Sequence, residues 1–580
     1  MIILGISAFF HDAAACILRD GVLVAAAEEE RFTRKKHDFS FPQQAIAYCL
    51  REAGITIKDV DHVAFYEKPL LKLERVLSQF LDSFPRGFSV FTQAMPSWIS
   101  EKLRIRSIIK RKLRFKKEIH FVEHHLSHAA ASYFMSPFSE AVLLTLDGVG
   151  EWSTATYGSA KNNTIRLEKE IRFPHSLGML YSAITAYLGM SVNNSEYKVM
   201  GLAPYGKPVY VDRLRNILHV QDDGSFALNM DYFVYTRKMA MLSQKFFAAF
   251  GPARKKDGPM TQHYKDMAAS VQQLLEETIF RILRNLHARY KIDNLCLAGG
   301  VALNSVANGK ILKNTPFKRL FIQPSAGDGG SSIGAAAFVA YSLYNQLPRY
   351  VMQHAYWGPS YDTTAIRSFL EKSTIVYKHY PQEKELLAET ARLLYTNHVI
   401  GWFQGRMEFG PRALGARSIL SNPCNPEMKD ILNLKVKHRE AFRPFAPVVC
   451  YEDARTYFDC DKEIPLPTDF MLMVYPIKKD KQKLLPAVTH VDGTGRLQTI
   501  RREHNTRYYD LIKAFGKLSG VPLLVNTSFN IRGEPIVCTP EDAYRCMMGT
   551  GIDYLVLGDF LIKRDDNPKD KWDSEAFADD

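Results

Sequence analysis

The chain has 580 residues, of which 46% are apolar and 12% aromatic, and its formal net charge is +13. This length and apolar content indicate a multidomain globular protein, and the positive charge suits either nucleic acid or an anionic small substrate such as a phosphate. The N-terminus lacks a basic signal-peptide start, no apolar run approaches about 18 residues, and the eight cysteines form no CxxC pair. We therefore do not expect a secreted, membrane-spanning or disulfide-stabilised protein, and we expect a cytoplasmic location.

The first segment of the chain predicts two apolar strands joined by a turn. ILGISAFFHDAAACIL, which contains His11 and Asp12, resembles VLLTLDGVGEWSTATYG further along the chain, and each has an aspartate at or near the turn. This faint internal repeat predicts two related halves, each a sheet with helices, and a cleft between them.

The most basic segment is EKLRIRSIIKRKLRFKKE, residues 101–118. Ile105, Ile108, Ile109 and Leu113 recur at helical spacing, which favours a surface helix that docks by this apolar stripe. A docking site for an acidic partner is the alternative interpretation.

A candidate metal site begins in the segment EHHLSHAAASYF, residues 123–134. His124 and His128 are four residues apart and would lie on one face of a helix. Asp147 follows a buried strand and Asp328 lies in a Gly-rich turn after another strand, so each could add a carboxylate. Two imidazoles and two carboxylates suit Fe(II), Mn(II) or Zn(II). The alternative is a half-buried helix start whose imidazoles are satisfied by ordinary hydrogen bonds.

From residue 265 the pattern becomes helix, strand, Gly-rich turn and helix, which indicates an α/β region with ligands at strand ends. Gly299, Gly300 and Asn304 would follow one such strand. Glycines allow a phosphate or nucleoside to approach the backbone, although a simple tight turn explains them equally well. The segment LPRYVMQHAYWGPSY, residues 347–361, lacks a clear period. We expect domains at residues 1–352 and 353–566, followed by an acidic tail at 567–580.

The second half carries basic and small polar residues in several segments beside predicted strands. Forked arginine donors in glycine-rich loops suit phosphate oxygens, whereas an isolated loop arginine is usually only solvated. Their recurrence favours an anion site. The residues concerned are Arg406, Arg412, Arg417, Lys437, Arg439, Arg443, Arg496, Gln498, Asn526, Ser528 and Asn530.

Eleven motifs in colinear order resemble the nodulation-type O-carbamoyltransferases, a family that includes antibiotic carbamoyltransferases. The likeness extends from Met1 to about Lys563. The motifs are HDAAAC, EERFTRKKHDFSFP, HHLSHAAASYF, LTLDGVGEWSTATYG, EYKVMGLAPYGKP, GGVALN, SAGDGGSSIGAA, EFGPRALGARSIL, KHREAFRPFAP, HVDGTGRLQT and NTSFNIRGEPIV.

The resemblance implies an α/β fold with two domains of different kinds. The N-terminal domain would be an actin-like ATPase domain similar to tRNA threonylcarbamoyl-transferring proteins, and the C-terminal domain would be similar to threonylcarbamoyl-adenylate synthases. The second domain would make carbamoyl-adenylate from carbamoyl phosphate and ATP, which normally binds with Mg²⁺. The first would transfer the carbamoyl group to a hydroxyl of a glycoside or other natural product, as in secondary metabolism, with Fe(II), or Mn or Zn in its place.

The resemblance also assigns roles to individual residues. The metal ligands would be His124, His128, Asp147 and Asp328. His11, Asp12, Arg412, Arg417 and Lys437 would take part in catalysis, with Arg412, Arg417 and Lys437 in the carbamoyl phosphate and ATP site. Arg496, Asn526 and Ser528 would bind cofactor in that same site, and Glu196, Lys198, Gly300 and Asn304 would line the nucleotide site of the first domain.

Two other functions stay open at this point. A tRNA-modifying enzyme that makes threonylcarbamoyl-adenosine has relatives of both domains, and a non-enzymatic ATP-gated binding module would use nucleotide only to set domain closure. We expect a small-molecule hydroxyl acceptor as the partner and neither nucleic acid nor membrane. A homodimer is compatible with the sequence, which does not fix the oligomeric state.

Overall fold

The computed structural model describes residues 1–440 and 442–568, so the predicted acidic tail lies, from residue 569 onward, outside the described residues. The chain divides into two compact units. The first comprises Met1–Ala26 and Phe39–Met352, and the second comprises Ala27–Asp38 and the chain from Gln353 onward. Each unit combines sheets and helices, which confirms the predicted α/β class. No helix within the described ranges is long and apolar enough to span a bilayer.

The first unit contains two five-stranded sheets with the same connectivity. The strand orders are β3-β2-β1-β4-β5 and, read from the corresponding edge, β8-β7-β6-β11-β12. In both, the first strand pairs antiparallel with the second and parallel with the fourth. This duplicated order is the arrangement expected of the actin-like ATPase fold that the resemblance implies, and it explains the faint sequence repeat. The strands are β1 (Ile2–Ser7), β2 (Ala14–Arg19), β3 (Val22–Glu28), β4 (His62–Phe65), β5 (Glu118–Phe121), β6 (Glu140–Leu146), β7 (Ser153–Lys161), β8 (Thr164–Arg172), β11 (Asn294–Ala298) and β12 (Arg319–Phe321), with a separate ribbon of β9 (Leu218–Val220) and β10 (Phe226–Leu228).

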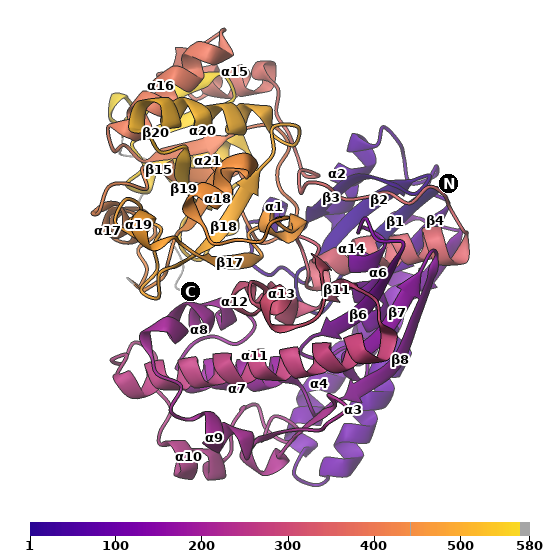
Figure 1. Ribbon diagram of the computed structural model, residues 1–580. Coiled ribbons are helices and arrows are strands. Elements are labelled where there is room, and N and C mark those ends of the chain that lie inside the picture. Colours follow the sequence, from indigo (N-terminus) through magenta and orange to yellow (C-terminus); the bar gives the residue numbers. More distant parts are fainter. Residues whose placement is uncertain (441, 569–580) are drawn as a thin grey trace. The chain divides into compact units, whose positions relative to one another are not determined.

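Two helices made largely of small residues, α6 (His124–Tyr133) and α14 (Asp328–Ala337), pack against each other and against strands of both sheets (Figure 1). A Cβ added at Gly334 would lie 1.8 Å from the carbonyl oxygen of Ser127, so only glycine allows the two backbones to approach this closely. The contact fixes the two helices that carry three of the four predicted metal ligands. The sequence analysis placed Asp328 in a Gly-rich turn, but it is the first residue of α14.

The remaining helices of the first unit surround these sheets. Ile105, Ile108 and Ile109 are buried on α5 (Ile105–Leu113), which confirms the predicted docking of the basic helix by its apolar stripe. The other helices are α2 (Gln43–Glu52), α3 (Pro69–Ser83), α4 (Phe88–Ser100), α7 (Leu177–Tyr187), α8 (Glu196–Leu202), α9 (Val211–Arg215), α10 (Gln244–Phe250), α11 (Gln262–Tyr290), α12 (Ser305–Asn308) and α13 (Ile311–Asn314).

The second unit is built on a nine-stranded mixed sheet of order β13-β21-β20-β14-β15-β19-β16-β18-β17. Its strands are β13 (Lys378–His379), β14 (Ile400–Phe403), β15 (Arg417–Ser421), β16 (Ala446–Cys450), β17 (Met473–Pro476), β18 (Thr494–Ile500), β19 (Leu523–Ser528), β20 (Tyr554–Leu557) and β21 (Phe560–Lys563). Its helices after residue 353 are α15 (Thr363–Lys372), α16 (Glu383–Tyr395), α17 (Met428–Ile431), α18 (Ala454–Tyr457), α19 (Lys479–Gln482), α20 (Thr506–Ser519) and α21 (Pro540–Met548).

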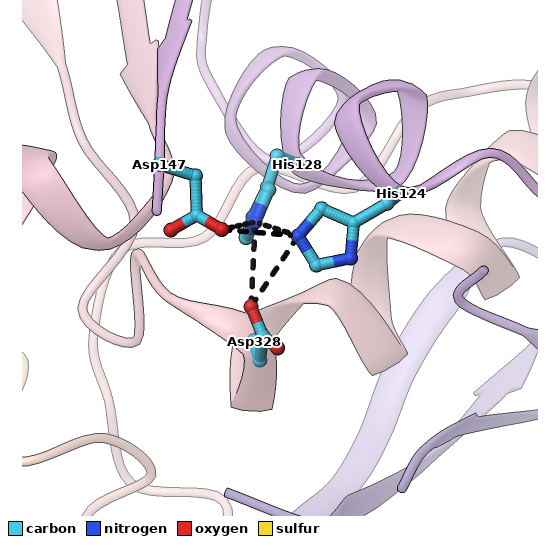
Figure 2. Close-up of side chains that lie close together, drawn as sticks. All are labelled: His124, His128, Asp147 and Asp328. Carbon is cyan, nitrogen blue, oxygen red and sulfur yellow. Dashed lines mark hydrogen bonds and ion pairs between the residues drawn. The ribbon is translucent and has the colours of Figure 1, made fainter. Parts of the chain in front are cut away.

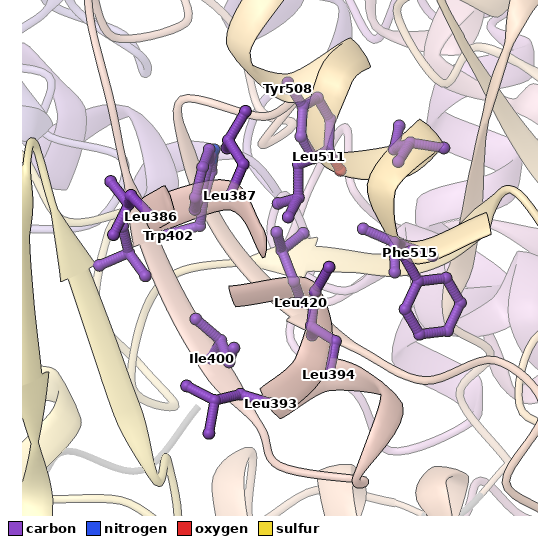
Figure 3. Close-up of a cluster of buried hydrophobic side chains, with 14 of the residues drawn as sticks. Leu386, Leu387, Leu393, Leu394, Ile400, Trp402, Leu420, Tyr508, Leu511 and Phe515 are labelled. Carbon is purple, nitrogen blue, oxygen red and sulfur yellow. The ribbon is translucent and has the colours of Figure 1, made fainter. Parts of the chain in front are cut away.

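The core of the second unit lies between its sheet and the helices α16 and α20 (Figure 3). Leu386 and Leu394 on α16 and Leu511 and Phe515 on α20 are buried in one cluster with Trp402 on β14. Each such side chain contributes about 1.5–3 kcal/mol by burial, so this cluster holds the sheet that carries the polar loops at its edge.

The structure corrects one part of the expected domain division. Ala27–Asp38, which the sequence analysis assigned to the first domain, belongs to the second unit. Within it, α1 (Glu30–Thr33) carries Arg31, which donates to the carbonyl of Gly410, while the Glu28 carboxylate accepts from the Gly410 amide at 2.8 Å. These buried polar contacts join residues almost 400 positions apart, which local sequence patterns do not reveal.

Candidate metal and anion sites

The four predicted metal ligands converge in the first unit (Figure 2). His124 and His128 lie one turn apart on α6, Asp147 directly follows β6, and Asp328 is the first residue of α14. All four are buried, and one ligand atom from each lies within 4.8 Å of the others. Helix spacing and the ends of β6 and β12, which flank β11 in one sheet, thus bring together residues from three distant segments.

The distances between these atoms fit a tetrahedral cation site. The two imidazole Nε2 atoms are 3.0 Å apart, and each lies 3.5 Å from Asp328 Oδ1. Asp147 Oδ2 lies 3.2 Å from His124 Nε2 and 3.9 Å from His128 Nε2. Metal–ligand bonds of about 2.0–2.2 Å in tetrahedral geometry separate ligand atoms by about 3.3–3.6 Å. The donor set is also of the nitrogen and oxygen type that suits Fe, Mn or Zn.

Outer contacts hold these ligands in place. The Gly300 amide donates to Asp147 Oδ1 at 2.8 Å, which leaves Oδ2 directed at the histidines. Ser331 Oγ lies 2.9 Å from His128 Nδ1, and the Glu151 carboxylate accepts from the His124 amide at 3.0 Å. Such supports commonly fix the orientation and tautomer of ligands in metal sites.

The charges of the cluster also favour a cation. Burial disfavours a charged imidazole, yet the nearby Asp147 and Asp328 carboxylates outweigh it and raise the pKa of His128 to about 9. Burial opposes ionisation of Asp328, but His11 and His124 hold its pKa below the ordinary value. Among the described residues neither oxygen of Asp328 receives a hydrogen bond. A buried carboxylate without donors is costly unless a positive charge compensates it.

His11 and Asp12 lie in the loop between β1 and β2, beside the metal cluster. His11 Nδ1 is 3.0 Å from Asp12 Oδ2, and His11 Nε2 is 3.8 Å from Asp328 Oδ2. Burial favours a neutral ring, but the Asp328 and Asp12 carboxylates outweigh it and raise the pKa of His11 to about 10. His125, by contrast, faces Thr145 at 2.6 Å and lies outside the ligand set.

The residues expected to line the nucleotide site lie in two places. Gly300 contacts Asp147, as described above. The Asn304 side chain, by contrast, is hydrogen-bonded to other protein groups. It accepts from the Ala307 amide and thereby caps α12, and it exchanges two hydrogen bonds with the Gln272 side chain. Glu196 begins α8 and accepts from the Ser182 hydroxyl at 2.7 Å. Lys198 is buried on the same helix.

Four guanidinium groups form an anion-attracting cluster in the second unit. Burial, and then the charges of Arg412, Arg439 and Arg443, holds the pKa of Arg496 well below its ordinary value. Arg496 lies on β18, and its Nε is buried without a hydrogen-bond partner among the described residues. An unpaired guanidinium facing three others is stabilised by a phosphate, which suits the predicted role of Arg412 and Arg496.

Arg417 differs from these arginines in what it contacts. It is fully buried at the start of β15, and its two Nη atoms donate to the carbonyls of Gln404, Gly405, Ala416 and Pro359. Its guanidinium also stacks on Phe403 at 3.6 Å. The structure therefore places Arg417 as a residue that holds the loop before β15.

The other polar residues predicted in this region are linked by hydrogen bonds. Lys437 Nζ donates to the Ser528 carbonyl and to Asn530 Oδ1, the latter at 2.8 Å, and burial followed by the charges of neighbouring arginines holds its pKa well below the ordinary value. Asn526 donates to Gln498 Oε1 at 2.6 Å, and its own Oδ1 receives no hydrogen bond from the described residues. Asn526 thus keeps an acceptor for a ligand, whereas the Lys437 ammonium is surrounded by four oxygen atoms of Ser528 and Asn530.

Glu408 is a residue that the sequence analysis did not single out. Its buried carboxylate accepts from the amides of Leu414, Ala416 and Arg417 at 2.7–3.2 Å, which folds the loop that presents Arg412. The signal was a single acid directly before the basic segment FGPRALGAR.

Comparison with known proteins identifies relatives of both units. Residues 2–337 match the family model described as carbamoyltransferase N-terminus, and residues 391–564 match carbamoyltransferase C-terminus. The uncharacterised Synechocystis protein sll1178 is 47% identical, with both chains covered completely. Nodulation protein NolNO of Sinorhizobium fredii is 38% identical over 98% of this chain and 81% of its own.

Solved structures show only distant likeness. The Acidaminococcus fermentans (R)-2-hydroxyglutaryl-CoA dehydratase component A aligns with 59% of this chain and 99% of its own, at 14% identity and a TM-score of 0.33. HypF of T. kodakarensis aligns with 60% of this chain and 48% of its own, at 14% identity and a TM-score of 0.32. Scores this low carry no argument about function.

Proposed function

Because the chain belongs to the nodulation-type carbamoyltransferase family, we propose that it activates carbamate as carbamoyl-adenylate and transfers the carbamoyl group to a hydroxyl of a small molecule. The observation that carries this proposal is the separation of two kinds of site: four convergent metal ligands in one unit and a cluster of arginines in the other. Each suits one half-reaction.

The chemistry explains why two half-reactions are needed. Carbamate is a poor electrophile because its charge and its nitrogen lone pair feed the carbonyl carbon. In the proposed first step, water removes phosphate from carbamoyl phosphate, and a carbamate oxygen then attacks the α-phosphorus of ATP and displaces pyrophosphate. Arg412, Arg496 and Lys437 would neutralise the phosphates during this step.

In the second step the acceptor oxygen attacks the carbonyl carbon of carbamoyl-adenylate, AMP leaves, and the hydroxyl proton passes to a base. Fe(II), or Mn or Zn in its place, would be held by His124, His128, Asp147 and Asp328 and would supply Lewis-acid polarisation. His11 is the base that we propose, because its Nε2 lies beside Asp328 whereas His125 is buried against Thr145. A cation held by the ligand set would offset the Asp328 charge that otherwise keeps the His11 ring protonated. Burial of the whole ligand set would keep water from the reactive anhydride.

Exchange of radiolabelled pyrophosphate into ATP tests the first half-reaction. We expect exchange to require carbamoyl phosphate and to proceed without threonine or tRNA. A requirement for threonine would instead support the tRNA-modifying alternative. Arg496→Met should abolish exchange, whereas Arg455→Met, at an exposed arginine of the same unit, should not change it.

Metal analysis tests the second site independently. The purified protein should contain about one Fe, Mn or Zn per chain, and His128→Ala should lose most of it while keeping pyrophosphate exchange. His219→Ala, at an exposed histidine of the first unit, serves as the matched control. A protein that binds no transition metal would contradict the transfer site and favour the ATP-gated binding module.

A further inference from the structure

Arg75 is a buried cation that the proposed reaction does not use. It lies on α3, which contacts α4 (Figure 1), and only 8% of its surface is exposed. Its Nε and Nη1 atoms are buried, and the guanidinium makes no hydrogen bond or ion pair with the residues that the structure describes. One face of the group lies against the Phe173 ring, 5.2 Å from its centroid.

The acids near Arg75 are committed to other groups. Glu67 pairs with Lys72 Nζ at 2.5 Å, and Glu151 accepts from the backbone amides of Lys68 and His124. Burial outweighs the attraction of these two carboxylates and lowers the pKa of Arg75 to about 10. Arg75 is therefore a guanidinium without a matching anion.

A second unpaired cation lies close by. Lys102 Nζ sits over the Trp98 ring at 5.0 Å and forms no ion pair within the described chain. Burial, followed by the charge of Lys72, lowers its pKa, and Arg75 acts in the same direction. Of the three cations near Glu67, only Lys72 is directly paired with it. We call Lys72, Arg75 and Lys102 the basic cluster.

The basic cluster borders the candidate metal site. Lys72 Nζ lies over the Phe10 ring at 4.4 Å, Phe10 contacts the His11 ring at 4.6 Å, and His11 in turn lies beside Asp328. On the other side, Glu151 links the start of α3 to the first metal ligand through the Lys68 and His124 amides. Phe10 and His11 thus connect the basic cluster to the candidate metal ligands through side-chain contacts.

We propose that Arg75 and Lys102 bind an anionic group of the acceptor, so that the hydroxyl compound carbamoylated here carries a carboxylate, sulfate or phosphate. The identification of the bound molecule as the acceptor rests on the proposed function, whereas the anion site itself is inferred from the geometry of these side chains. A guanidinium that is buried without partners costs stability, and an anion with two adjacent oxygens restores that loss through paired, charge-assisted hydrogen bonds.

Sulfate is the probe for the anion site. Thermal unfolding of the full chain is followed as sulfate replaces chloride at constant ionic strength, in an Arg496→Met background that weakens the anion cluster of the second unit. Sulfate should stabilise this parent and its Arg86→Met control, because binding to the folded state alone raises the unfolding temperature. Arg75→Met should weaken the apparent affinity for sulfate roughly tenfold or more, and Lys102→Met should weaken it severalfold.

The same variants separate binding from a structural role. Without sulfate, Arg75→Met should be at least as stable as its parent, since methionine removes an unpaired charge and keeps the contact with Phe173. A large loss of stability would show that Arg75 is structural and would overturn the proposal. An unchanged response to sulfate in both Arg75→Met and Lys102→Met would overturn it as well.

A matched pair of sugars tests the role in acceptor binding. Methyl glucuronide and methyl glucoside differ in a carboxylate, and AMP release from ATP and carbamoyl phosphate is measured with each. We expect kcat/KM for the glucuronide to exceed that for the glucoside by about tenfold, and Arg75→Met to remove the preference without changing pyrophosphate exchange. If the two sugars give equal kcat/KM values, or neither stimulates AMP release, while pyrophosphate exchange is intact, the result contradicts the proposed acceptor subsite but not the proposed function. Loss of exchange in the unmodified protein would refute the proposed function instead.

Discussion

Replacing Arg417 and Arg496 separately by methionine should distinguish an arginine that holds a loop from one that awaits a ligand. Arg417 donates to four backbone carbonyls and stacks on Phe403, and its removal leaves those buried oxygens without donors. Hydrogen bonds from a charged donor contribute about 1.5–3 kcal/mol each but are not additive. We therefore expect Arg417→Met to lower the free energy of unfolding of the second unit by about 3–5 kcal/mol.

Arg496→Met should behave differently because no described group depends on the Arg496 guanidinium for a hydrogen bond. Its removal also relieves repulsion from three neighbouring arginines, so stability should stay within about 1 kcal/mol or rise. Both variants should lose pyrophosphate exchange, the first through a disordered loop and the second through lost phosphate binding.

Urea denaturation together with hydrogen exchange of peptides covering β14 and β15 would measure the difference. Faster exchange around β15 is expected for Arg417→Met and normal protection for Arg496→Met, with Arg455→Met as the exposed control. Equal destabilisation of the two variants would refute the distinction drawn from their contacts. So would an Arg417→Met protein as stable as the unmodified chain.

Three further changes follow from single contacts. Gly300→Ala would place a Cβ 2.9 Å from Asp147 Oδ1, so metal affinity should fall about 10- to 100-fold with little change in fold, as measured by metal titration and circular dichroism. Arg31→Met should cost about 3–5 kcal/mol, because Glu28 would remain buried without its partner; urea denaturation would show this, and a neutral result would contradict it. Burial disfavours the charged Asp469 carboxylate more than nearby donors favour it, and raises its pKa from 3.8 to about 6. The protonated carboxyl therefore stabilises the folded chain at low pH, and this stabilisation is lost as the pH rises from about 4 through 6. Asp469→Asn should therefore gain up to about 3 kcal/mol over the unmodified chain at pH 7 and nothing near pH 4, and a gain that does not change with pH would contradict this assignment.

Local patterns were sufficient to anticipate that the four candidate metal ligands converge. The i, i+4 spacing of His124 and His128 fixes their common face, and Asp147 and Asp328 follow strands that lie close to one another in the second sheet. The α/β class and the duplicated halves followed from the same strand and turn signals. These features depend on residues that are close together in the sequence, and local sequence patterns could therefore predict them.

Roles that depend on distant partners could not be predicted in this way. Arg417 and Arg496 are both arginines beside strands, and only the positions of backbone carbonyls show that the first is satisfied and the second is not. Asn304 has the composition of a nucleotide ligand, yet its amide is used by Gln272 and a helix cap. The sequence gives no sign that Arg75 is buried, because an arginine on an amphipathic helix is usually solvated.

The segment Ala27–Asp38 bears on how this protein can be recombined with its relatives. Glu28 and Arg31 meet the Gly410 backbone through both a carboxylate and a guanidinium, so this segment depends on the position of the Gly410 loop. A chimera joined at residue 352 would pair this segment with a foreign loop. Exchanges that also carry residues 27–38 from the donor of the C-terminal half should express and fold more often than those that do not.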